Sequence, residues 1–296
     1  MANALLQAII SGILVGATYA LVAMGIVIVY RSSGIFNFAH GAIILVEAFV
    51  FWTLTSLAQW PLGLCVLITV ATAYAIGAGI EFLAMRPLLG QPILPSIMMT
   101  LGLSMLFIGI YEVVWGHRGP VTFPEFMPMG HWVVGEIVIG QANTIILGAA
   151  ILLLLLFNLF FRFTDTGKQV QAICESHIIA QSVGIDVKRV LSFVWVIACG
   201  CAALAGILVG ATGSVGIHLD ELVFMVIPVI ILGGLESMGG ALIAGLIVGL
   251  VEMISAAFID PIIGGGFRQV APYLFLLIIL IVKPYGLFGW KRIERI

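Results

Sequence analysis

The sequence predicts an all-α polytopic membrane protein with about eight to nine transmembrane helices, some of them re-entrant or broken. Of the 296 residues, 62% are hydrophobic and only 9% are charged. The apolar residues also fall in segments of about 20 residues, the length that a helix needs to cross a bilayer. Soluble domains are about 25% charged. The composition therefore excludes an ordinary soluble enzyme, a disordered chain and a nucleic-acid-binding protein.

Nine apolar segments are expected as helices. The first carries no charge, and at about 1.5 Å per residue it is longer than the bilayer core is thick, so it must tilt or bend. The seventh contains Pro228, Gly233 and Gly234 and is short enough for a half-helix. The segments are residues 3–30, 34–57, 62–85, 93–115, 143–161, 190–212, 222–235, 239–258 and 269–283.

The distribution of Lys and Arg predicts the orientation. If the first span runs from outside to inside, ten of the twelve fall on the inner side, and only Arg118 and Arg268 fall outside. This agrees with the positive-inside rule. Nine crossings then put the N-terminus outside and the C-terminus in the cytoplasm. An eight-span alternative has the N-terminus inside and one segment re-entrant. Residues 1–30 hold no Lys or Arg and no cleavage site, so we expect a retained span.

Two Gly-rich breaks predict a pair of pseudo-repeats. Gly34-Ile-Phe-Asn-Phe-Ala-His-Gly-Ala42 opens one apolar segment, and Gly233-Gly-Leu-Glu-Ser-Met-Gly-Gly-Ala241 opens another about 199 residues later. Paired interruptions in two halves are typical of a transport pathway built from repeats. The alternative is that small residues only allow helices to pack closely.

Several polar residues fall within the apolar segments. Asn37 and His40 are three residues apart, so we expect them on one helical face, with Glu47 deeper in the same segment. Polar groups at membrane depth face protein or water. They therefore either line an aqueous path or join helices by hydrogen bonds. Glu81 is expected to extend toward the inner interface, and Glu252 to lie within reach of water at an outer end.

No catalytic or nucleotide-binding motif is present in the sequence. The single Gly-Lys pair, Gly167-Lys168, is followed by Gln169, and Arg162 stands where a phosphate-binding loop needs Gly. We therefore expect a chain that is not an enzyme and binds no cofactor. The four cysteines show neither a CxxC motif nor clustering with His, which predicts reduced thiols and no metal site.

The inner loop, residues 162–189, is the one long charged stretch between predicted spans. We expect Thr166 to N-cap a helix over 167–173, and a second short helix over about 176–183 to end at Gly184 in a left-handed C-cap. A short exposed amphipathic helix suits docking into a groove on a soluble partner. A plain linker is the alternative.

Six segments in one order along nearly the whole chain resemble the high-affinity branched-chain amino acid permease family of bacterial ABC importers, specifically its shorter, H-type subunit. One departure is Ser176-His177, where the family often has Asn-Pro. The segments are Gly16-Ala-Thr-Tyr-Ala-Leu, Gly34-Ile-Phe-Asn-Phe-Ala-His-Gly41, Thr166-Gly-Lys-Gln-Val-Gln-Ala, Ile179-Ala-Gln-Ser-Val-Gly-Ile-Asp, Ile231-Leu-Gly-Gly-Leu-Glu-Ser-Met-Gly-Gly-Ala and Lys283-Pro-Tyr-Gly-Leu-Phe-Gly.

The resemblance implies a non-enzymatic permease subunit, one domain over residues 1–296, in a bacterial inner membrane. Its implied partners are a second, related M-type permease, two ABC ATPase subunits that bind ATP and Mg²⁺, and a periplasmic substrate-binding protein that delivers leucine, isoleucine or valine. It also implies two groups of site residues. The ATPase-coupling group is Glu175, Ser176, His177, Ala180, Gly184 and Ile185; the translocation path or gate is Asn37, His40, Gly41, Glu47, Gly233, Gly234, Glu236 and Ser237.

Rival functions remain open at this point. A secondary transporter would need an ionisable relay, for which Glu47, His40 and Glu252 are the candidates. A passive channel would have no use for a docking helix. Within the importer class, urea, short amides and aromatic acids are alternative cargoes. Uptake that depends on ATP and not on a proton gradient would favour the importer over the secondary transporter and the channel.

Overall fold

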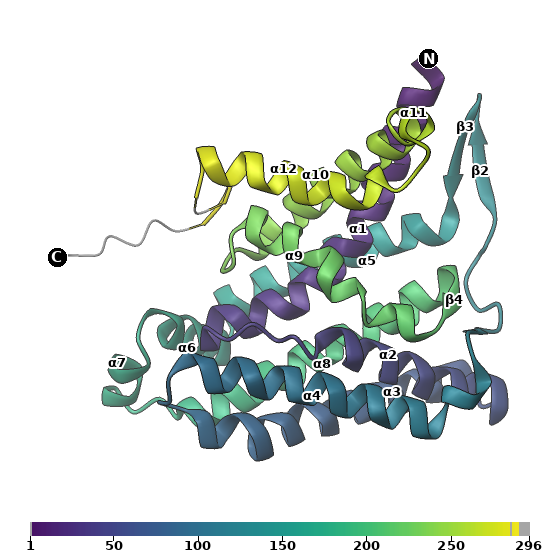
Figure 1. The fold of residues 1–296 in the computed structure, drawn as a ribbon. Coiled ribbons are helices and arrows are strands. Elements are labelled where there is room, and N and C mark those ends of the chain that lie inside the picture. Colours follow the sequence, from purple (N-terminus) through teal and green to yellow (C-terminus); the bar gives the residue numbers. More distant parts are fainter. Residues whose placement is uncertain (1, 285, 290–296) are drawn as a thin grey trace. The chain divides into compact units, whose positions relative to one another are not determined.

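The computed structural model describes residues 2–284 and 286–289, without the side chains of residues 2, 177 and 178. Apart from short strands, its regular elements are helices (Figure 1), which confirms the predicted all-α polytopic class. The chain divides into two compact units. Unit 1 comprises residues 1–27, 128–154 and 224–296, and unit 2 comprises residues 28–127 and 155–223.

Seven helices in the described part of the chain are long and apolar enough to cross a membrane. The other two predicted segments are also helical but shorter: α9 (Leu222–Gly233) has 12 residues and α12 (Phe267–Val282) has 16. At about 1.5 Å per residue, α9 reaches only about 18 Å, well short of a core about 30 Å thick. This length agrees with the half-helix expected there.

Unit 2 is built on four apolar helices. Helix α8 (Val187–Thr212) packs against both α2 (His40–Trp52) and α3 (Leu62–Gly79), and α2 also packs against α4 (Ile93–Val114). The remaining elements of unit 2 are the π-helices η1 (Thr53–Leu57) and η2 (Ile80–Met85), the 3-10 helices η3 (Arg86–Leu88), η4 (Gly116–Arg118) and η5 (Ile217–Leu219), helices α6 (Asp165–Glu175) and α7 (His177–Ser182), and the antiparallel strands β1 (Val121–Thr122) and β4 (Ser214–Val215).

Unit 1 is centred on α10 (Met238–Phe258), which packs against α12 and the first part of α1 (Ala2–Ser33). A Cβ added at Gly12 would lie 2.7 Å from Leu250 Cα, so this glycine serves close helix packing. Helices α1, α5 (Gln141–Phe163) and α9 each have residues in both units. Unit 1 also contains α11 (Asp260–Ile263) and the strands β2 (His131–Val134) and β3 (Ile137–Gly140).

The hairpin β2–β3, which lies between α4 and α5, was not predicted from the sequence. Its register pairs His131 with Gly140 and Val134 with Ile137 around a two-residue turn. Valine and isoleucine favour strands, and a Gly at the start of a two-residue turn suits a tight hairpin. The Gln7 side chain fixes the hairpin to α1, because its amide donates to Val138 O at 3.0 Å and accepts from Val138 N at 2.8 Å.

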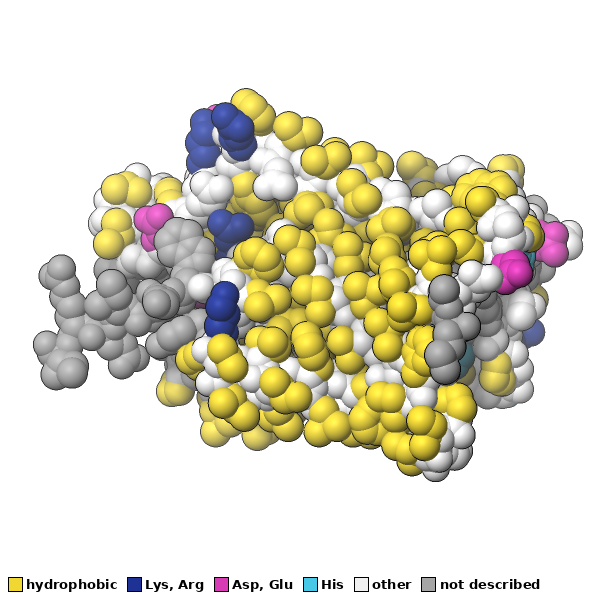
Figure 2. Space-filling view, turned by 90° about the horizontal axis from the view of Figure 1, so that it is seen from above, with side chains coloured by type: hydrophobic (Ala, Val, Ile, Leu, Met, Phe, Trp, Pro, Cys, Tyr) yellow, Lys and Arg dark blue, Asp and Glu magenta, His cyan; other side chains and the backbone are white. Residues whose placement is uncertain are grey.

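Large hydrophobic side chains are exposed along several of the predicted spans. Leu83, Met105 and Val113 have exposed fractions of 75%, 72% and 84%. Figure 2 shows a face on which hydrophobic side chains cover most of the surface. Soluble monomers do not expose apolar surface on this scale. The exposed faces therefore fit contact with lipid, as expected of a membrane protein.

Candidate functional site

The first predicted break lies between α1 and α2, where residues 34–39 are not helical. Helix α1 ends at Ser33, and Gly34 follows with a positive φ of 71°. Asn37 lies within this break, so the expectation that Asn37 and His40 share a helical face is wrong. Its Oδ1 instead accepts a hydrogen bond from Ala39 N at 3.1 Å, which turns the chain into α2. The reason is that an Asn side chain competes well for backbone N–H groups ahead of a helix.

Asn37 and His40 are both fully buried in unit 2. Among the described residues, Asn37 Nδ2 and both ring nitrogens of His40 have no hydrogen-bond partner. A buried polar group left unsatisfied costs about 1–3 kcal/mol. Such groups are rare in native proteins, and each needs an explanation. The pair is therefore costly for the fold in the state that the structure shows.

Gly41 and Glu47 lie further along α2. A Cβ at Gly41 would overlap the carbonyl oxygen of Asp220, so only glycine allows the two backbones to approach this closely. Glu47 is fully buried, as expected of a residue deep in the segment. Its Oε2 lies 2.9 Å from Thr72 Oγ1, while Oε1 has no partner in the part of the chain that the structure describes.

The second predicted break separates α9 from α10 in unit 1. Gly234 has a positive φ of 88°, and the chain turns before Ser237 begins the next helix. The Ser237 hydroxyl accepts from Gly240 N at 3.0 Å, the hydrogen bond of an N-cap. Glu236 is half-buried in this turn. Both breaks thus begin with a left-handed glycine, Gly34 in one and Gly234 in the other.

The terminal motif packs on this second break. A Cβ at Gly234 would lie 2.6 Å from Gly289 N, and Leu287 N donates to Leu232 O at 2.7 Å. The described residues between Lys283 and Gly289 therefore contact the segment that links α9 to α10. This contact gives a structural reason for Gly at position 234.

The inner loop begins with α6, and its N-cap differs from the expected one. Thr164, not Thr166, caps the helix, because the Thr164 hydroxyl accepts from Gly167 N at 2.9 Å. Helix α5 ends at Phe163, so the chain turns at Thr164 and α6 starts directly afterwards. Thr166 lies inside the first turn of α6.

Helix α7 is capped at both ends; the left-handed C-cap at Gly184 was predicted, and the N-cap at Ser176 was not. The Ser176 hydroxyl accepts from Ile179 N at 3.3 Å. At the other end Gly184 N donates to Gln181 O, and Ile185 N donates to Ala180 O, both at 3.0 Å. Together with the positive φ of 86° at Gly184, this pattern is a Schellman motif.

Two apolar side chains at α7 are exposed, Ile179 within the helix and Val183 at its C-cap, beside the exposed polar residues Gln181 and Ser182. Ala180 is buried, whereas Ile179 and Val183 have exposed fractions of 66% and 70%. Glu175 is exposed at the end of α6, and the side chain of His177 lies outside the described residues. An exposed apolar pair on a short, doubly capped helix is a surface suited to a protein partner.

Tyr19, Glu252 and Arg268 form a polar cluster in unit 1. The sequence did not predict that these three residues meet. Glu252 is 5% exposed, which overturns the expectation that it lies within reach of water. The Tyr19 hydroxyl donates to Glu252 Oε2 at 2.6 Å, and Arg268 Nε lies 3.7 Å from Glu252 Oε1. These contacts satisfy the buried carboxylate and connect α1, α10 and α12.

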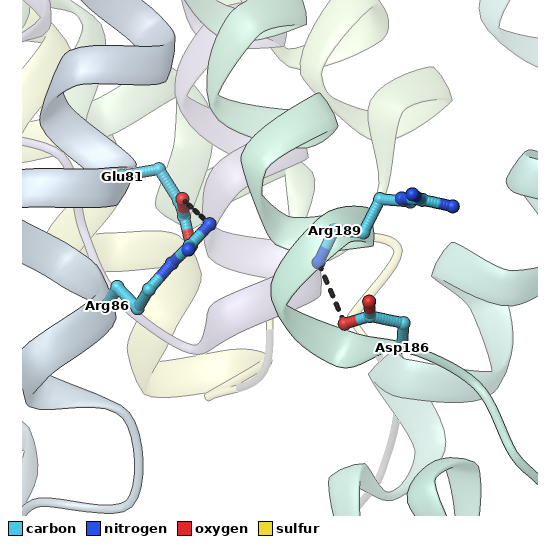
Figure 3. Close-up of polar contacts among 4 residues, drawn as sticks. All are labelled: Glu81, Arg86, Asp186 and Arg189. Atoms are coloured by element: carbon cyan, nitrogen blue, oxygen red, sulfur yellow. Dashed lines mark hydrogen bonds and ion pairs between the residues drawn. The ribbon is translucent and has the colours of Figure 1, made fainter.

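Glu81 likewise differs from its expected role. It is 1% exposed, so its carboxylate is buried in the protein. Instead, Arg86 reaches back to it, with Nε and Nη2 donating to the two carboxylate oxygens at 3.1 and 2.8 Å (Figure 3). The π-helix η2 makes this possible, because its i→i+5 winding puts residues five apart on one face.

Comparison with known proteins places the chain in a family. Residues 8–283 match the sequence profile described as "Branched-chain amino acid transport system / permease component". The chain is 30% identical to the high-affinity branched-chain amino acid transport system permease protein LivH of Escherichia coli K12, over 98% of this chain and 97% of that one. It is 28% identical to the corresponding protein BraD of Pseudomonas aeruginosa, over 98% of each chain.

A solved structure supports the fold. PsaBC from Streptococcus pneumoniae, determined in complex with Fab, matches with a TM-score of 0.50 over 95% of this chain and 92% of that chain. The sequence identity is 17%, so this likeness concerns the fold alone. From its match to the family profile and its coverage of these relatives, the chain belongs to the family of branched-chain amino acid transport system permease components.

Proposed function

We propose that this chain is the transmembrane permease subunit of an ATP-driven ABC importer for leucine, isoleucine and valine. Membership of the permease family supports the transport role, and the names of LivH and BraD support the cargo. Urea, short amides and aromatic acids are the alternative cargoes. The proposed location is a bacterial inner membrane with the C-terminus in the cytoplasm; Lys291, Arg292 and Arg295, which contribute to that orientation, lie outside the described residues.

The partners that we propose are a second, M-type permease, two ABC ATPase subunits and a periplasmic binding protein. ATP and Mg²⁺ bind to the ATPases, and this chain binds no cofactor and catalyses no reaction. The observation that carries this proposal is that α7 is a short helix capped at both ends, with exposed apolar side chains. Ile179 and Val183 are exposed to solvent between Ser176 and Gly184. The positive φ of Gly184 turns the chain toward α8. Motion of an ATPase against such a helix would be transmitted to α8, which begins at Val187.

The translocation path is proposed to include two sets of residues. In unit 2 they are Asn37, His40, Gly41 and Glu47, and in unit 1 Gly233, Gly234, Glu236 and Ser237. Support comes from the unsatisfied polar atoms of Asn37 and His40. Water or solute would provide their missing hydrogen bonds in a state of the cycle in which the first break opens.

Cysteine accessibility tests the path. The native Cys65, Cys174, Cys199 and Cys201 are first replaced by Ala or Ser. Cysteine at 37 or 40 is then expected to react with a small hydrophilic thiol reagent at rates that change when ATP is trapped. If both positions stay unreactive in every state of an active complex, the pair serves helix packing alone.

Uptake into membrane vesicles tests the function itself. We expect uptake of labelled leucine that depends on ATP and persists when an uncoupler removes the proton gradient. Collapse of uptake with the gradient would favour a secondary transporter, with Glu47 as the buried carboxylate of its relay. Uptake that needs neither ATP nor a gradient would favour a channel. Competition by urea, short amides or aromatic acids identifies a different cargo.

A further inference from the structure

A basic pocket lies at the end of α3 and the start of α8, entirely within unit 2. It has a volume of about 440 Å³. Helices α3 and α8 pack tightly beside it, since a Cβ at Gly77 would lie 2.7 Å from Trp195 O. The lining side chains that matter here are Arg86, Lys188 and Arg189, which are cationic, and Tyr74, Ser192 and Phe193.

The positive charge of this pocket is only partly neutralised. Arg86 is paired with the buried Glu81. Asp186 also lines the pocket, and its Oδ1 accepts from Arg189 N at 3.2 Å as the N-cap of α8. Figure 3 shows these two pairs on neighbouring helices, with the Arg189 guanidinium directed away from the Asp186 carboxylate. Both acidic groups therefore already have partners.

Arg86 has an ion-pair partner, whereas Lys188 and Arg189 have none in the described part of the chain. Both side chains are exposed, and neither makes an ion pair or side-chain hydrogen bond with any residue that the structure describes. With three cations and two carboxylates, the formal charge around the pocket is +1. The two unpaired cations are next to each other in sequence at the start of a membrane helix. An anion that entered the pocket would find donors that are free to bind it.

The other wall of the pocket is apolar and aromatic. Tyr74 has an exposed fraction of 62% and Phe193 of 41%. Both belong to helices long and apolar enough to span the membrane. Tyr74 lies near the middle of the continuous helical span Leu62–Leu88, and a tyrosine can contact acyl chains with its ring while its hydroxyl reaches a polar group. A ligand that fits both walls has an anionic head and an apolar body.

We propose that this pocket binds the headgroup phosphate of an anionic phospholipid, with the first acyl carbons against Tyr74 and Phe193. Basic pockets at the cytoplasmic ends of transmembrane helices suit such headgroups. The lipid contacts α3 and α8 together, so it stabilises the contact between them next to the inner loop. Only the choice of the cytoplasmic leaflet rests on the proposed function; the binding itself requires only that the chain spans a membrane.

Native mass spectrometry of the detergent-solubilised transporter tests this proposal, with phosphatidylglycerol and a zwitterionic phosphatidylcholine as probes. We expect selective retention of phosphatidylglycerol, reduced about fivefold by Lys188→Gln or Arg189→Gln, because each basic residue near an anionic surface contributes about that factor. Both side chains are exposed, so the variants should keep the wild-type unfolding temperature. Arg162→Gln, an exposed arginine at the end of α5 outside the pocket, is the matched control and should retain wild-type lipid.

Four outcomes would overturn the proposal. Equal retention of both lipids, or unchanged retention in the Lys188 and Arg189 variants, would show that the pocket is not the lipid site. Displacement of the lipid by millimolar inorganic phosphate, with phosphate retained in its place, would assign the pocket to a free anion. Loss of an ATPase subunit from the variants with lipid retention intact would assign the two cations to subunit docking. Because lipid retention is measured without transport, a failure here is distinguishable from a failure of the proposed import.

Discussion

Replacing Gly184 by Pro should uncouple ATP hydrolysis from transport. Gly184 has a φ of 86°, whereas Pro is fixed near about −65°. The replacement also removes the N–H that donates to Gln181 O at 3.0 Å. The lost hydrogen bond costs about 0.5–1.5 kcal/mol, and Pro cannot adopt the left-handed conformation that other L-residues reach for about 1–2 kcal/mol, so the end of α7 should lose at least about 2–3 kcal/mol. A helix of six residues has no stability of its own to absorb that loss.

The assay is the stimulation of ATP hydrolysis by loaded binding protein in the assembled transporter. No atom lies within 4 Å of a Cβ built at Gly184, so the effect comes from backbone conformation and not from a clash. Gly90 is the matched control, because it has a φ of 84° and equally open surroundings but lies between η3 and α4. We expect Gly184→Pro to abolish most of the stimulation and Gly90→Pro to preserve it. Wild-type stimulation in Gly184→Pro, or equal loss in both variants, would refute the coupling role of α7.

Three further perturbations test the packing and charge of the two units. Tyr19→Phe removes the 2.6 Å hydrogen bond to the buried Glu252, and we expect about 1–3 kcal/mol lower stability in detergent unfolding; an unchanged unfolding curve would contradict this. Gly41→Ala should lower the unfolding temperature through its clash with the Asp220 carbonyl, whereas Gly102→Ala, which has open space in α4, should leave it unchanged or raise it. Burial raises the pKa of the Asp220 carboxyl above its ordinary value. Between the pKa of the unfolded state and that of the folded state, the folded protein therefore binds more protons, and the free energy of unfolding falls as pH rises from the first value to the second. Asp220→Asn should remove this part of the pH dependence, and an unchanged pH profile of unfolding would count against it.

Features set by local sequence were predictable. The spans follow from uninterrupted apolar composition, and the end of α7 follows from Gly184 after a short amphipathic stretch, because a Schellman motif needs only its own residues. The two breaks were predictable for the same reason, since Gly34 and Gly234 interrupt apolar runs at the points where the backbone turns left-handed.

Features set by distant or unusual geometry were not predictable. Tyr19 and Glu252 are 233 residues apart, and nothing near either one indicates the other. Glu81 and Arg86 are five residues apart, a spacing that α-helical periodicity does not bring together and a π-helix does. Asn37 was expected on a helix because its neighbours are apolar, but its own side chain favours the turn that precedes α2.

The N-cap of α6 shows how tertiary packing selects between two similar residues. Thr164 and Thr166 are both suitable caps by residue type. A Cβ at Gly167 would overlap the Phe160 carbonyl oxygen, so the start of α6 lies directly against the last turn of α5. In this arrangement the backbone N and the hydroxyl of Thr164 both donate to Phe160 O, and the helix begins two residues earlier than expected.

The coupling role of α7 is tested most directly by photo-crosslinking from this helix in the assembled transporter. A photoreactive amino acid replaces Val183, whose side chain is 70% exposed, and in a control replaces Val134 of β2, which is 63% exposed. We expect the probe at 183 to form its main adduct with an ATPase subunit, in a yield that changes when ATP is trapped, and the probe at 134 not to capture that subunit. Capture of the ATPase from 134, or none from 183 in a complex that retains its ATPases, would contradict the assignment of α7 as the coupling element.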